Sequence, residues 1–424
     1  MNTPNAPKFA VVGNYSCANR GDCAILRGLC DDLERRKIQF EVFSEHPEQG
    51  EKFFGKSLTP TPLASFEIRS KAQWLAAELL MRRSSLGPAM LSVSRFRREL
   101  GYLRRFDGII FAGGSYFVDI YGAHKYLLPA FAGAAKIPFA LCGHSIGPFE
   151  TSDRVRSWAS AALSRSTAIT LRDTASREHA ERIGIPLRLL VDSADTAWIK
   201  PESRKRKLYP LSSSKQLVAI SARDLSPFEK RLGIKKRDVI SWMAACIDQL
   251  IELGVHPVGL STCTSYAGYR FDDRVILKEI QGRLTNPSAM SIIEDELNDL
   301  EIAGVYERCD AVLSMRMHAT ILAMRAGTPA FIIPYEHKSS SLFRQAGMED
   351  RIFMPCEVQP KEIASDIFRV SHDKCERSRI SAMANAIEQI ASQGVGVAVE
   401  SLLHAMAKRG RHASPAECGL TTVT

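Results

Sequence analysis

The sequence predicts an α/β protein made of two similar domains that face each other across a cleft. Short apolar runs alternate with longer amphipathic segments along most of the 424 residues. This alternation is typical of parallel sheets with helices on both faces. A polar segment, residues 200–216, interrupts the pattern before a second series begins. A chain of this length is expected to hold two or three domains.

The N-terminal half contains the first series of expected strands and helices. It begins with a strand at 9–13, followed by a helix over 23–34, where Ile25, Leu29 and Leu33 recur at helical spacing. Further strands are expected at 40–44, 108–114 and 139–147, and from Ala168 and Leu189 onward. We expect these strands to form one parallel sheet.

Residues 200–216 read as a linker because they hold Pro201, Pro210, three consecutive serines and the basic run 204–207. The second series follows, with strands from Leu217, Val255, Ala311 and Ala330 and a helix over 239–253. A last helix over 379–407 precedes a basic, then small-residue tail that we expect to be disordered.

These elements divide the chain into a first Rossmann-like domain, residues 1–199, and a second, residues 217–395. Residues 396–424 form the end of the last helix and the tail. Two Rossmann-like halves facing a cleft are the arrangement of GT-B glycosyltransferases. Ligands of such sheets bind beyond the carboxyl ends of the strands.

The composition and the net charge of the chain limit the kinds of ligand that we expect it to bind. Hydrophobic residues make up 45% and charged residues 24%, as in an ordinary globular protein. The net charge of +9 suits an acidic small molecule or an anionic membrane surface, but it is too weak to indicate nucleic acid, and no nucleic-acid-binding motif is present. None of the ten cysteines forms a CxxC pair, so we expect no zinc site. No cluster of carboxylates or histidines calls for another metal, and a magnesium ion that arrives with the substrate is the alternative.

The expected location is the cytoplasm. The N-terminus lacks the apolar core of a signal peptide, and no stretch reaches the roughly 18 apolar residues of a membrane span. Residues 81–105, however, hold seven arginines and only one acid, Glu99. This basic insertion is either a solvated helical face or a contact with anionic lipid or a diphosphate-bearing acceptor. Peripheral attachment to the inner face of the membrane therefore stays open.

The most informative motif places Arg316 and His318 two residues apart, where an apolar strand gives way to a helix. A fixed cation and a titratable base at such a helix N-terminus suit an anionic substrate that needs a proton moved. The alternative is that Arg316 pairs with a structural carboxylate and His318 packs internally.

The loop 13–25, GNYSCANRGDCAI, follows a strand and opens a helix. Gly13 and Gly21 allow tight turns, and Asp22 is placed to cap the helix. We expect the loop, with Asn14 and Asp22, to contact a phosphate or a sugar hydroxyl. The alternative is a plain turn in which Arg20 pairs with Asp22.

Polar residues also follow two later strands. Gly114 would allow close approach of a ligand, Ser115 adds a hydroxyl, and Asp119 is a candidate for orienting a sugar hydroxyl or accepting its proton, or else for holding a loop. His144 would face the cleft if its strand ends at Cys142, and is otherwise a hydrogen-bonded structural histidine.

Arginines stand at the ends of two further strands, at Arg172 in the motif LRD and at Arg223 in SARD. Two or three arginines that converge on a cleft fit a ligand with a phosphate and a carboxylate.

Taken together, these motifs resemble the polysaccharide pyruvyl transferase family. The matching segments run from residue 13 to about residue 347 and are GNYSCANRGDCAI, AGGSYFVD, GHSIGPF, LRD with VDSADTAW, and SMRMHATILAMRAGTPAFIIPYEHKS. Finer features, such as LSTCTSY, DELNDLE and YEHKS, are similar to the colanic acid and amylovoran pyruvyl transferases. The family's Arg-Leu-His motif falls on Arg316 and His318, with Met317 in place of the leucine.

The resemblance implies a GT-B-like fold, phosphoenolpyruvate as co-substrate without a further cofactor, and a pyruvate ketal bridging two hydroxyls of one sugar. Arg316 and Arg223 would hold the donor, His318 would donate a proton, and Lys338 would be a further binding residue. The acceptor would be a sugar on a lipid-linked oligosaccharide. A GT-B glycosyltransferase that uses a nucleotide sugar, and a non-catalytic partner in polysaccharide assembly, are the alternatives.

Overall fold

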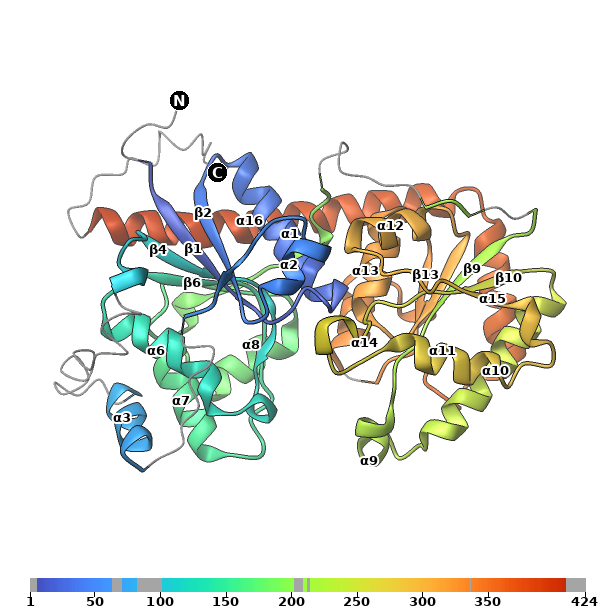
Figure 1. Ribbon diagram of the computed structural model, residues 1–424, viewed down its shortest axis with the longest axis horizontal. Coiled ribbons are helices and arrows are strands. Elements are labelled where there is room, and N and C mark those ends of the chain that lie inside the picture. Colours follow the sequence, from blue (N-terminus) through green and yellow to red (C-terminus); the bar gives the residue numbers. More distant parts are fainter. Residues whose placement is uncertain are drawn as a thin grey trace.

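The computed structural model describes residues 6–62, 71–81, 101–201, 209–211, 214–335 and 337–408. Two α/β domains lie side by side, and the long helix α16 (Glu376–Ala407) runs along both of them (Figure 1). The predicted fold class, two Rossmann-like halves, is confirmed. None of the helices in the described part of the chain is long and apolar enough to cross a bilayer.

The first domain contains an eight-stranded sheet with the order β3-β2-β1-β4-β6-β7-β8, in which β5 pairs with β6. Every pairing within it is parallel. Its strands are β1 (Lys8–Asn14), β2 (Gln39–Ser44), β3 (Thr59–Pro60), β4 (Gly108–Phe111), β5 (Gly114–Phe117), β6 (Phe139–Ile146), β7 (Ile169–Leu171) and β8 (Leu190–Asp192). Its helices are α1 (Arg20–Arg35), α2 (Glu48–Phe53), α3 (Lys71–Met81), α6 (Leu127–Ala134), α7 (Asp153–Leu163) and α8 (Thr174–Arg182).

The second domain contains a five-stranded parallel sheet with the order β11-β10-β9-β12-β13. Its strands are β9 (Leu217–Ser221), β10 (His256–Gly259), β11 (Ser291–Ile292), β12 (Ala311–Ser314) and β13 (Ala330–Ile332). Its helices are α9 (Glu229–Leu232), α10 (Lys236–Glu252), α11 (Asp273–Gln281), α12 (Asp299–Glu307), α13 (Met317–Arg325), α14 (His337–Gln345) and α15 (Pro360–His372).

Every strand expected from the sequence is present, and most of them are buried apolar runs. The sequence missed β3 and β11, each only two residues long. It also read residues 108–114 as one strand, whereas β4 ends at Phe111 and β5 starts at Gly114. A Cβ at Gly113 would lie 2.5 Å from the carbonyl oxygen of Gly143. The glycine therefore lets the chain pass close to β6 between these two strands.

The two domains share one hydrophobic core around α1. That core continues from Leu26 and Leu29 of α1 to Ile302 and Val305 of α12. An ion pair of 2.8 Å between Arg27 and the fully buried Asp299 crosses the same contact. Because inter-domain motion is expected where an interface is small and polar, this apolar contact favours a fixed relation between the domains.

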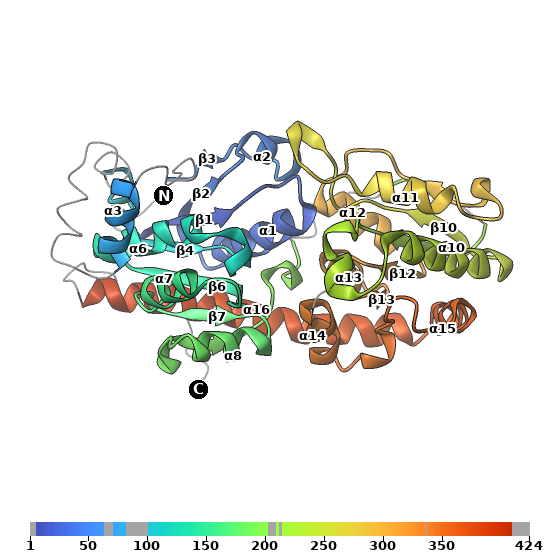
Figure 2. The same ribbon diagram turned by 90° about the horizontal axis from the view of Figure 1, so that it is seen from below.

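Helix α16 belongs to both domains. At its start, Arg377 bonds to the carbonyl oxygen of Cys309 in the second domain. Toward its end, Ser401 bonds to Thr167 of the first domain at 2.8 Å, and the two views agree that it lies across both sheets (Figures 1 and 2). Residues 396–407, which the sequence assigned to neither domain, thus pack on the first one.

Candidate functional site

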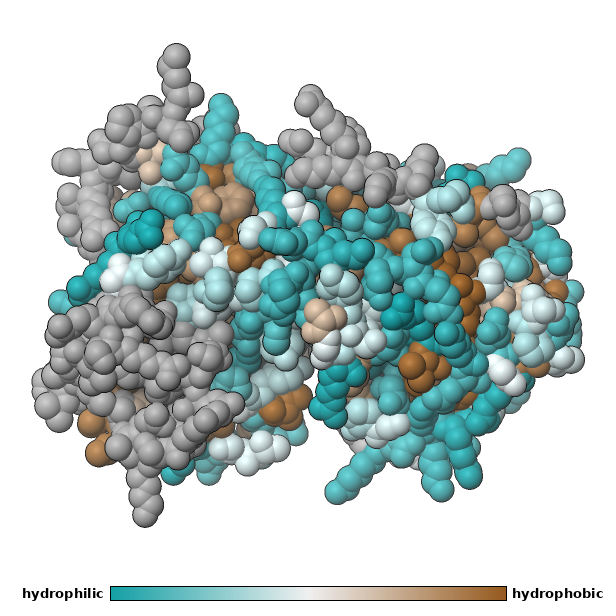
Figure 3. Space-filling model, viewed as in Figure 1, coloured by the Kyte–Doolittle hydropathy of each residue, from teal (hydrophilic) through white to brown (hydrophobic). Residues whose placement is uncertain are grey.

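The carboxyl ends of three neighbouring strands of the second sheet carry the residues that the sequence singled out. Arg223 follows β9, Arg316 follows β12 and Tyr335 follows β13, and these strands are adjacent in the order β9-β12-β13. Arg316 is the residue that precedes α13, and His318 lies in the first turn of that helix. The surface is notched between the two domains at the lower edge of the view in Figure 3, where α8 and α14 flank it.

Arg316 forms an ion pair with Asp273, so the structural-carboxylate alternative is correct for part of this side chain. Asp273 is buried and also accepts from the backbone N–H groups of Thr262 and Cys263 at 3.3 and 3.0 Å. Burial opposes the charge of Arg316, but Asp273 outweighs it and raises the pKa of the guanidinium. The Nε of Arg316 is buried and has no hydrogen-bond partner among the residues that the structure describes. The ion pair with Asp273 therefore holds Arg316 in place as a permanent cation, and the Nε–H group of Arg316 is left for another acceptor.

Arg223 lies close to Arg316 through a shared aromatic neighbour. Its guanidinium stands over the ring of Tyr335 at 4.3 Å and over that of Phe228 at 4.7 Å. Tyr335 in turn interacts electrostatically with Arg316. The Nε of Arg223 is likewise buried without a partner. Two arginines with unused donors are thus grouped at one sheet edge, as the sequence predicts.

His318 reaches across to the first domain. Its Nε2 lies 3.3 Å from an Oδ2 of Asp195, which follows β8. On the other side the ring meets the backbone of Gly21, where a Cβ would come within 2.3 Å of Nδ1. Gly21 is therefore required for close approach to His318, and not for a turn. The histidine is 16% exposed and is held between the two domains.

Asp195 is the centre of a buried polar network. Arg172 bonds through Nη1 to Asp195, through Nη2 to Ser115 at 2.6 Å and through Nε to Ser145 at 2.8 Å. Burial would raise the pKa of Asp195, but Arg172 and then His318 hold it well below its ordinary value. The carboxylate that holds His318 is therefore ionised.

Arg172, Asp173 and Asp195 of the first domain line a small pocket together with residues of α13 and α14. The space in and in front of this pocket, open solvent included, is about 240 Å³. The pocket lies between the two domains, beside the His318–Asp195 contact. The first domain therefore forms one of its walls and the second domain forms the other. In the part of the chain that the structure describes, no three histidine, cysteine or acidic side chains gather as a metal-binding group.

The loop 13–25 is held in place by its own polar groups. Asn14 is buried, and its side chain bonds to Ser44 at 2.8 Å and to the carbonyl oxygen of Asp22. The helix cap is Asn19, which accepts from the N–H of Gly21 at 3.1 Å, so the prediction that Asp22 caps α1 is wrong. Asp22 lies one turn further on and faces the hydroxyl of Tyr116.

Arg20 does not pair with Asp22. Its guanidinium reaches into the second domain and bonds to the carbonyl oxygen of Leu297 at 2.7 Å and to Glu296 and Thr264 at 2.8 Å each. Its backbone N–H also donates to the carbonyl oxygen of Thr262. The loop therefore fastens the two domains together directly beside His318.

Gly114, Ser115 and Asp119 take structural positions. Gly114 pairs with His144 where β5 meets β6, and Ser115 accepts from Arg172. One oxygen of Asp119 accepts from the N–H groups of Glu150 and Thr151, at 2.7 and 2.6 Å, and from the Thr151 hydroxyl. Burial opposes these bonds, but together they lower the pKa of Asp119. Asp119 thus holds a loop, which was the alternative to its catalytic role.

His144 does not face the interdomain cleft in the way expected, because β6 continues to Ile146 and does not end at Cys142. The ring is 1% exposed, its Nε2 lies 3.2 Å from the carbonyl oxygen of Phe111, and burial lowers its pKa to about 3. Lys338 lies in α14, but its side chain is outside the described residues. Most of the basic insertion, residues 82–100, is outside them as well.

The sequence analysis did not single out Asp195 or Asp273 as residues of the site. It named Arg172, but not its role in the network around Asp195. Asp195 and Arg172 do lie in the segments VDSADTAW and LRD, so the motifs contained the signal. Asp273 is the first residue of α11 and lies in none of the motifs described above, and only the tertiary fold brings it to Arg316.

Comparison with known proteins places the chain among polysaccharide pyruvyl transferases. The profile of that family matches residues 19–337. The amylovoran biosynthesis protein AmsJ of Erwinia amylovora is 31% identical over 407 residues, which cover 90% of this chain and 96% of that protein.

Solved structures match over nearly the whole chain at low identity. A putative UDP-N-acetylglucosamine 2-epimerase from Listeria monocytogenes matches with a TM-score of 0.60 and 10% identity, over 92% of this chain and 94% of that one. The UDP-GlcNAc 2-epimerase from Neisseria meningitidis matches with 0.56 and 13%, over 94% and 100%. The glycotransferase of kitacinnamycin matches with 0.55 and 12%, over 94% and 100%. These similarities show a GT-B-like fold.

Proposed function

Because the chain belongs to the polysaccharide pyruvyl transferase family, we propose that it transfers a pyruvyl group from phosphoenolpyruvate to two hydroxyls of one sugar in an exopolysaccharide repeat unit. The product is a pyruvate ketal. The observation that carries this proposal is that Arg223 and Arg316 stand at neighbouring strand ends of the second sheet, and that His318, two residues after Arg316, contacts Asp195 of the first domain. Similarity to an amylovoran biosynthesis protein supports the exopolysaccharide acceptor.

The two arginines suit the donor. Phosphoenolpyruvate carries a phosphate and a carboxylate, and guanidinium groups bind both by charge-assisted, often bidentate hydrogen bonds. Arg316 and Arg223 each keep a buried Nε without a partner. A buried donor left unsatisfied costs about 1–3 kcal/mol, which the bound anion would recover. In this proposal the bound anion accepts a hydrogen bond from the Nε–H group of each arginine.

His318 is the proposed general acid. Protonated, it would give its proton to the methylene carbon of the donor, and C2 would become an oxocarbenium-like centre. One sugar hydroxyl adds to C2 and loses its proton, and phosphate then leaves with its C–O bonding pair. The second hydroxyl closes the ketal and loses its proton. General acid catalysis of this kind contributes about 10²–10⁴-fold.

Asp195 orients the imidazole, because the buried carboxylate is ionised and lies 3.3 Å from Nε2. Nδ1 is then the nitrogen that would deliver the proton. It lies against the backbone of Gly21, so entry of the donor has to displace part of the loop 13–25. We assign no catalytic step to Asp119, because its carboxylate accepts hydrogen bonds from the backbone N–H groups of Glu150 and Thr151.

The deciding experiment incubates the purified protein with phosphoenolpyruvate and a panel of lipid-linked oligosaccharides. We expect release of inorganic phosphate and a mass gain of the acceptor that corresponds to a ketal. A parallel reaction with nucleotide sugars is expected to release no nucleoside diphosphate. Release of nucleoside diphosphate without ketal formation would replace this proposal by a glycosyltransferase. A separate liposome-binding measurement would test the peripheral membrane contact.

A further inference from the structure

Arg223 differs from the other arginines at the domain boundary in how its charge is balanced. Arg20, Arg27, Arg172 and Arg316 each form an ion pair with an aspartate or a glutamate. Arg223 forms no ion pair with any residue that the structure describes, and its Nε is buried without a hydrogen-bond partner among them. Its positive charge is therefore not offset within the described part of the chain.

The next residue in the chain, Asp224, is engaged with other groups. Its Oδ1 accepts from the N–H and the hydroxyl of Ser226, at 2.9 and 2.6 Å, and lies 3.9 Å from the Nζ of Lys236. Burial opposes the charge of Asp224, but the bonds from Ser226 outweigh it and lower the pKa of the carboxylate, and Lys236 contributes more to this than Arg223 does. Asp224 is therefore not the counter-ion of Arg223.

Two aromatic rings hold the guanidinium of Arg223 instead. Its central carbon lies 4.3 Å from the centre of the Tyr335 ring and 4.7 Å from that of Phe228. The two rings also contact each other, with 4.9 Å between their centres and 58° between their planes. The face of an aromatic ring attracts a cation but does not remove its net charge. We call Phe228 and Tyr335 the aromatic clamp.

The aromatic clamp is anchored in the second domain. Both of its rings pack against the hydrophobic core of that domain, and Tyr335 is buried in it. Arg223 follows β9 and Tyr335 follows β13, and β12 lies between these two strands. The contact between Arg223 and Tyr335 thus spans the end of β12, where Arg316 follows. The clamp fixes an unbalanced cation at the same sheet edge as Arg316.

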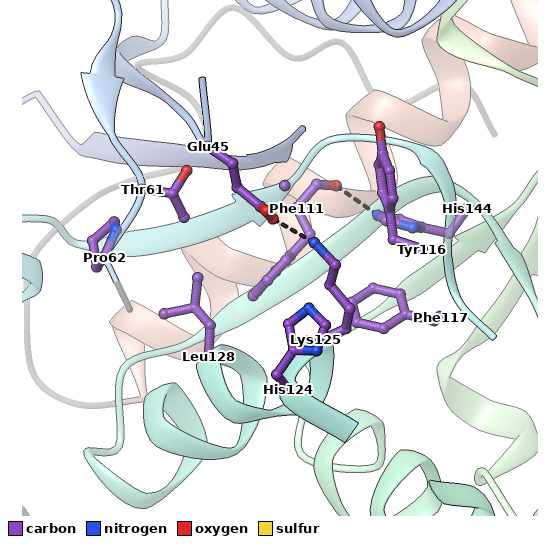
Figure 4. A pocket seen from close by; sticks show the side chains of 11 residues that line it. Glu45, Thr61, Pro62, Phe111, Tyr116, Phe117, His124, Lys125, Leu128 and His144 are labelled. Atoms are coloured by element: carbon purple, nitrogen blue, oxygen red, sulfur yellow. Dashed lines mark hydrogen bonds and ion pairs between the residues drawn. The ribbon is translucent and has the colours of Figure 1, made fainter. Parts of the chain in front are cut away.

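Lys125 of the first domain shows that ring contact alone is not what sets Arg223 apart. The Nζ of Lys125 also lies over two rings, those of Tyr15 and Tyr116, at 5.3 and 5.8 Å. Glu45, however, lies only 2.6 Å from the same Nζ, and the two side chains point toward each other (Figure 4). Lys125 is a neutralised cation over aromatic rings, whereas Arg223 is held over rings with its full charge.

The two halves of the proposed donor differ in charge. A phosphate monoester carries about −1.5 to −2 charges near pH 7 and offers three strong acceptor oxygens, whereas a carboxylate carries a single charge. Asp273 offsets the charge of Arg316 in part. Because attraction grows with the product of the charges, the more highly charged half suits the unbalanced arginine and the less charged half suits Arg316.

From these contacts we propose that Phe228 and Tyr335 are positioning residues, which hold Arg223 for the phosphate of the donor, and that Arg316 binds the carboxylate. This inference rests on the proposed function, because it divides the donor of that reaction between the two arginines. When the C2–O bond of the donor breaks and its electron pair leaves with the phosphate, the charge that develops on the phosphate oxygen lies at Arg223. A fixed cation at that point stabilises the departing group.

The division is tested by ligand-detected NMR titrations of the full chain with two probes, methyl phosphate and pyruvate, each of which carries one half of the donor. Arg223→Met is expected to raise the Kd of methyl phosphate at least about tenfold and to leave that of pyruvate within about twofold. Arg316→Lys, which keeps a cation beside Asp273, should show the reverse selectivity. No turnover is needed for either measurement.

The aromatic clamp is tested by removing one ring at a time. Tyr335→Leu and Phe228→Leu should each raise the Kd of methyl phosphate about threefold to tenfold, the effect of one cation–π contact, without changing that of pyruvate. Tyr335→Phe keeps the ring and should bind like the parent. The matched control Phe368→Leu removes another half-buried ring of the same core, which packs on His372. Circular dichroism of each variant checks the fold.

A double variant separates positioning from general packing. If the clamp acts through Arg223, Tyr335→Leu should have no further effect on methyl phosphate in a protein that already carries Arg223→Met. In ketal formation the single ring variants should raise the donor KM and leave the acceptor KM unchanged.

Equal loss of both probes in Arg223→Met would overturn the division of the donor. A loss in Tyr335→Leu that persists beside Arg223→Met would overturn the positioning role. A protein that forms the ketal while its ring variants bind both probes like the parent would leave the proposed function standing without the clamp. If the expected probe selectivity is found but no ketal forms from phosphoenolpyruvate, the proposed function fails, and the assignment of the two anionic groups to the two arginines stands.

Discussion

Two buried arginine–aspartate pairs, Arg172–Asp195 in the first domain and Arg316–Asp273 in the second, differ in how many nitrogens of the arginine have a partner. In the first domain, Arg172 bonds to Asp195, Ser115 and Ser145, so Nε and both Nη atoms have partners. In the second domain, Arg316 bonds to Asp273, and its Nε has no partner. Both arginines follow the end of a parallel strand, so position alone does not separate them.

This difference in hydrogen-bond partners indicates which of the two arginines is available to bind a ligand. A guanidinium bonded through all three of its nitrogens positions other groups, and here Arg172 holds the carboxylate that contacts His318. A guanidinium with an unused buried donor is ready for an anion. We therefore assign positioning to Arg172 and donor binding to Arg316, and the predictions below test that division.

His318 is where the two regions meet, and its removal is expected to have the largest effect. His318→Ala should lower the rate of ketal formation by about 10²–10⁴-fold, the usual contribution of a general acid. The rate is followed by phosphate release. The matched control His404→Ala removes an exposed histidine from the last turn of α16 and should keep full activity. Near-normal turnover of a folded His318→Ala protein would remove this residue from the mechanism.

Arg172→Met should act mainly on stability. It leaves Asp195 buried without its main cation, and breaking a buried pair in this way costs about 3–5 kcal/mol of unfolding free energy. Denaturant unfolding measures the loss. Arg156→Met, which breaks a surface pair with Asp153, should cost less than about 1 kcal/mol. Equal losses for the two variants would mean that the Arg172 network is not structural.

Arg316→Lys should act mainly on donor affinity. Lysine keeps the charge but not the planar fork, and one lost bond to a charged group contributes about 1.5–3 kcal/mol. We expect the dissociation constant for phosphoenolpyruvate to rise roughly tenfold to a hundredfold by calorimetry. Arg369→Lys, on the exposed face of α15, is the control. Unchanged affinity in Arg316→Lys would count against the proposed division of roles.

A last effect, seen only as the pH is lowered, concerns His144, which is buried beside the Arg172 network. Its folded pKa of about 3 lies below the ordinary value of 6.5, so the unfolded chain binds a proton that the folded protein excludes. Stability from this group is complete above pH 6.5 and falls as the pH drops toward 3, by about 1.4 kcal/mol per pH unit. His144→Gln should show a correspondingly shallower decline between pH 6.5 and 4.5. Parallel curves for the two proteins would contradict the buried neutral state.

Local pattern was enough to predict the fold class and most of its strands. Segments such as 9–13, 217–221 and 311–314 are apolar runs between turn signals, and burying such runs in parallel sheets satisfies both their side chains and their backbone groups. The strand-end positions of Arg223, Arg316 and His318 followed from the same pattern, because the carboxyl ends of parallel strands lie at one edge of the sheet.

The sequence by itself therefore determined the architecture, the family and the residues at the edge of the second sheet. Only the tertiary structure decided which charged groups meet: Arg20 with Glu296, Asp273 with Arg316, and Asp195 with His318. It also decided that Asp119 holds a loop and that His144 is buried. The physical reason is that hydrophobic periodicity is a local property of the chain. The pairing of buried polar groups depends on partners that are distant in the sequence, as Arg20 and Glu296 are, which lie 276 residues apart.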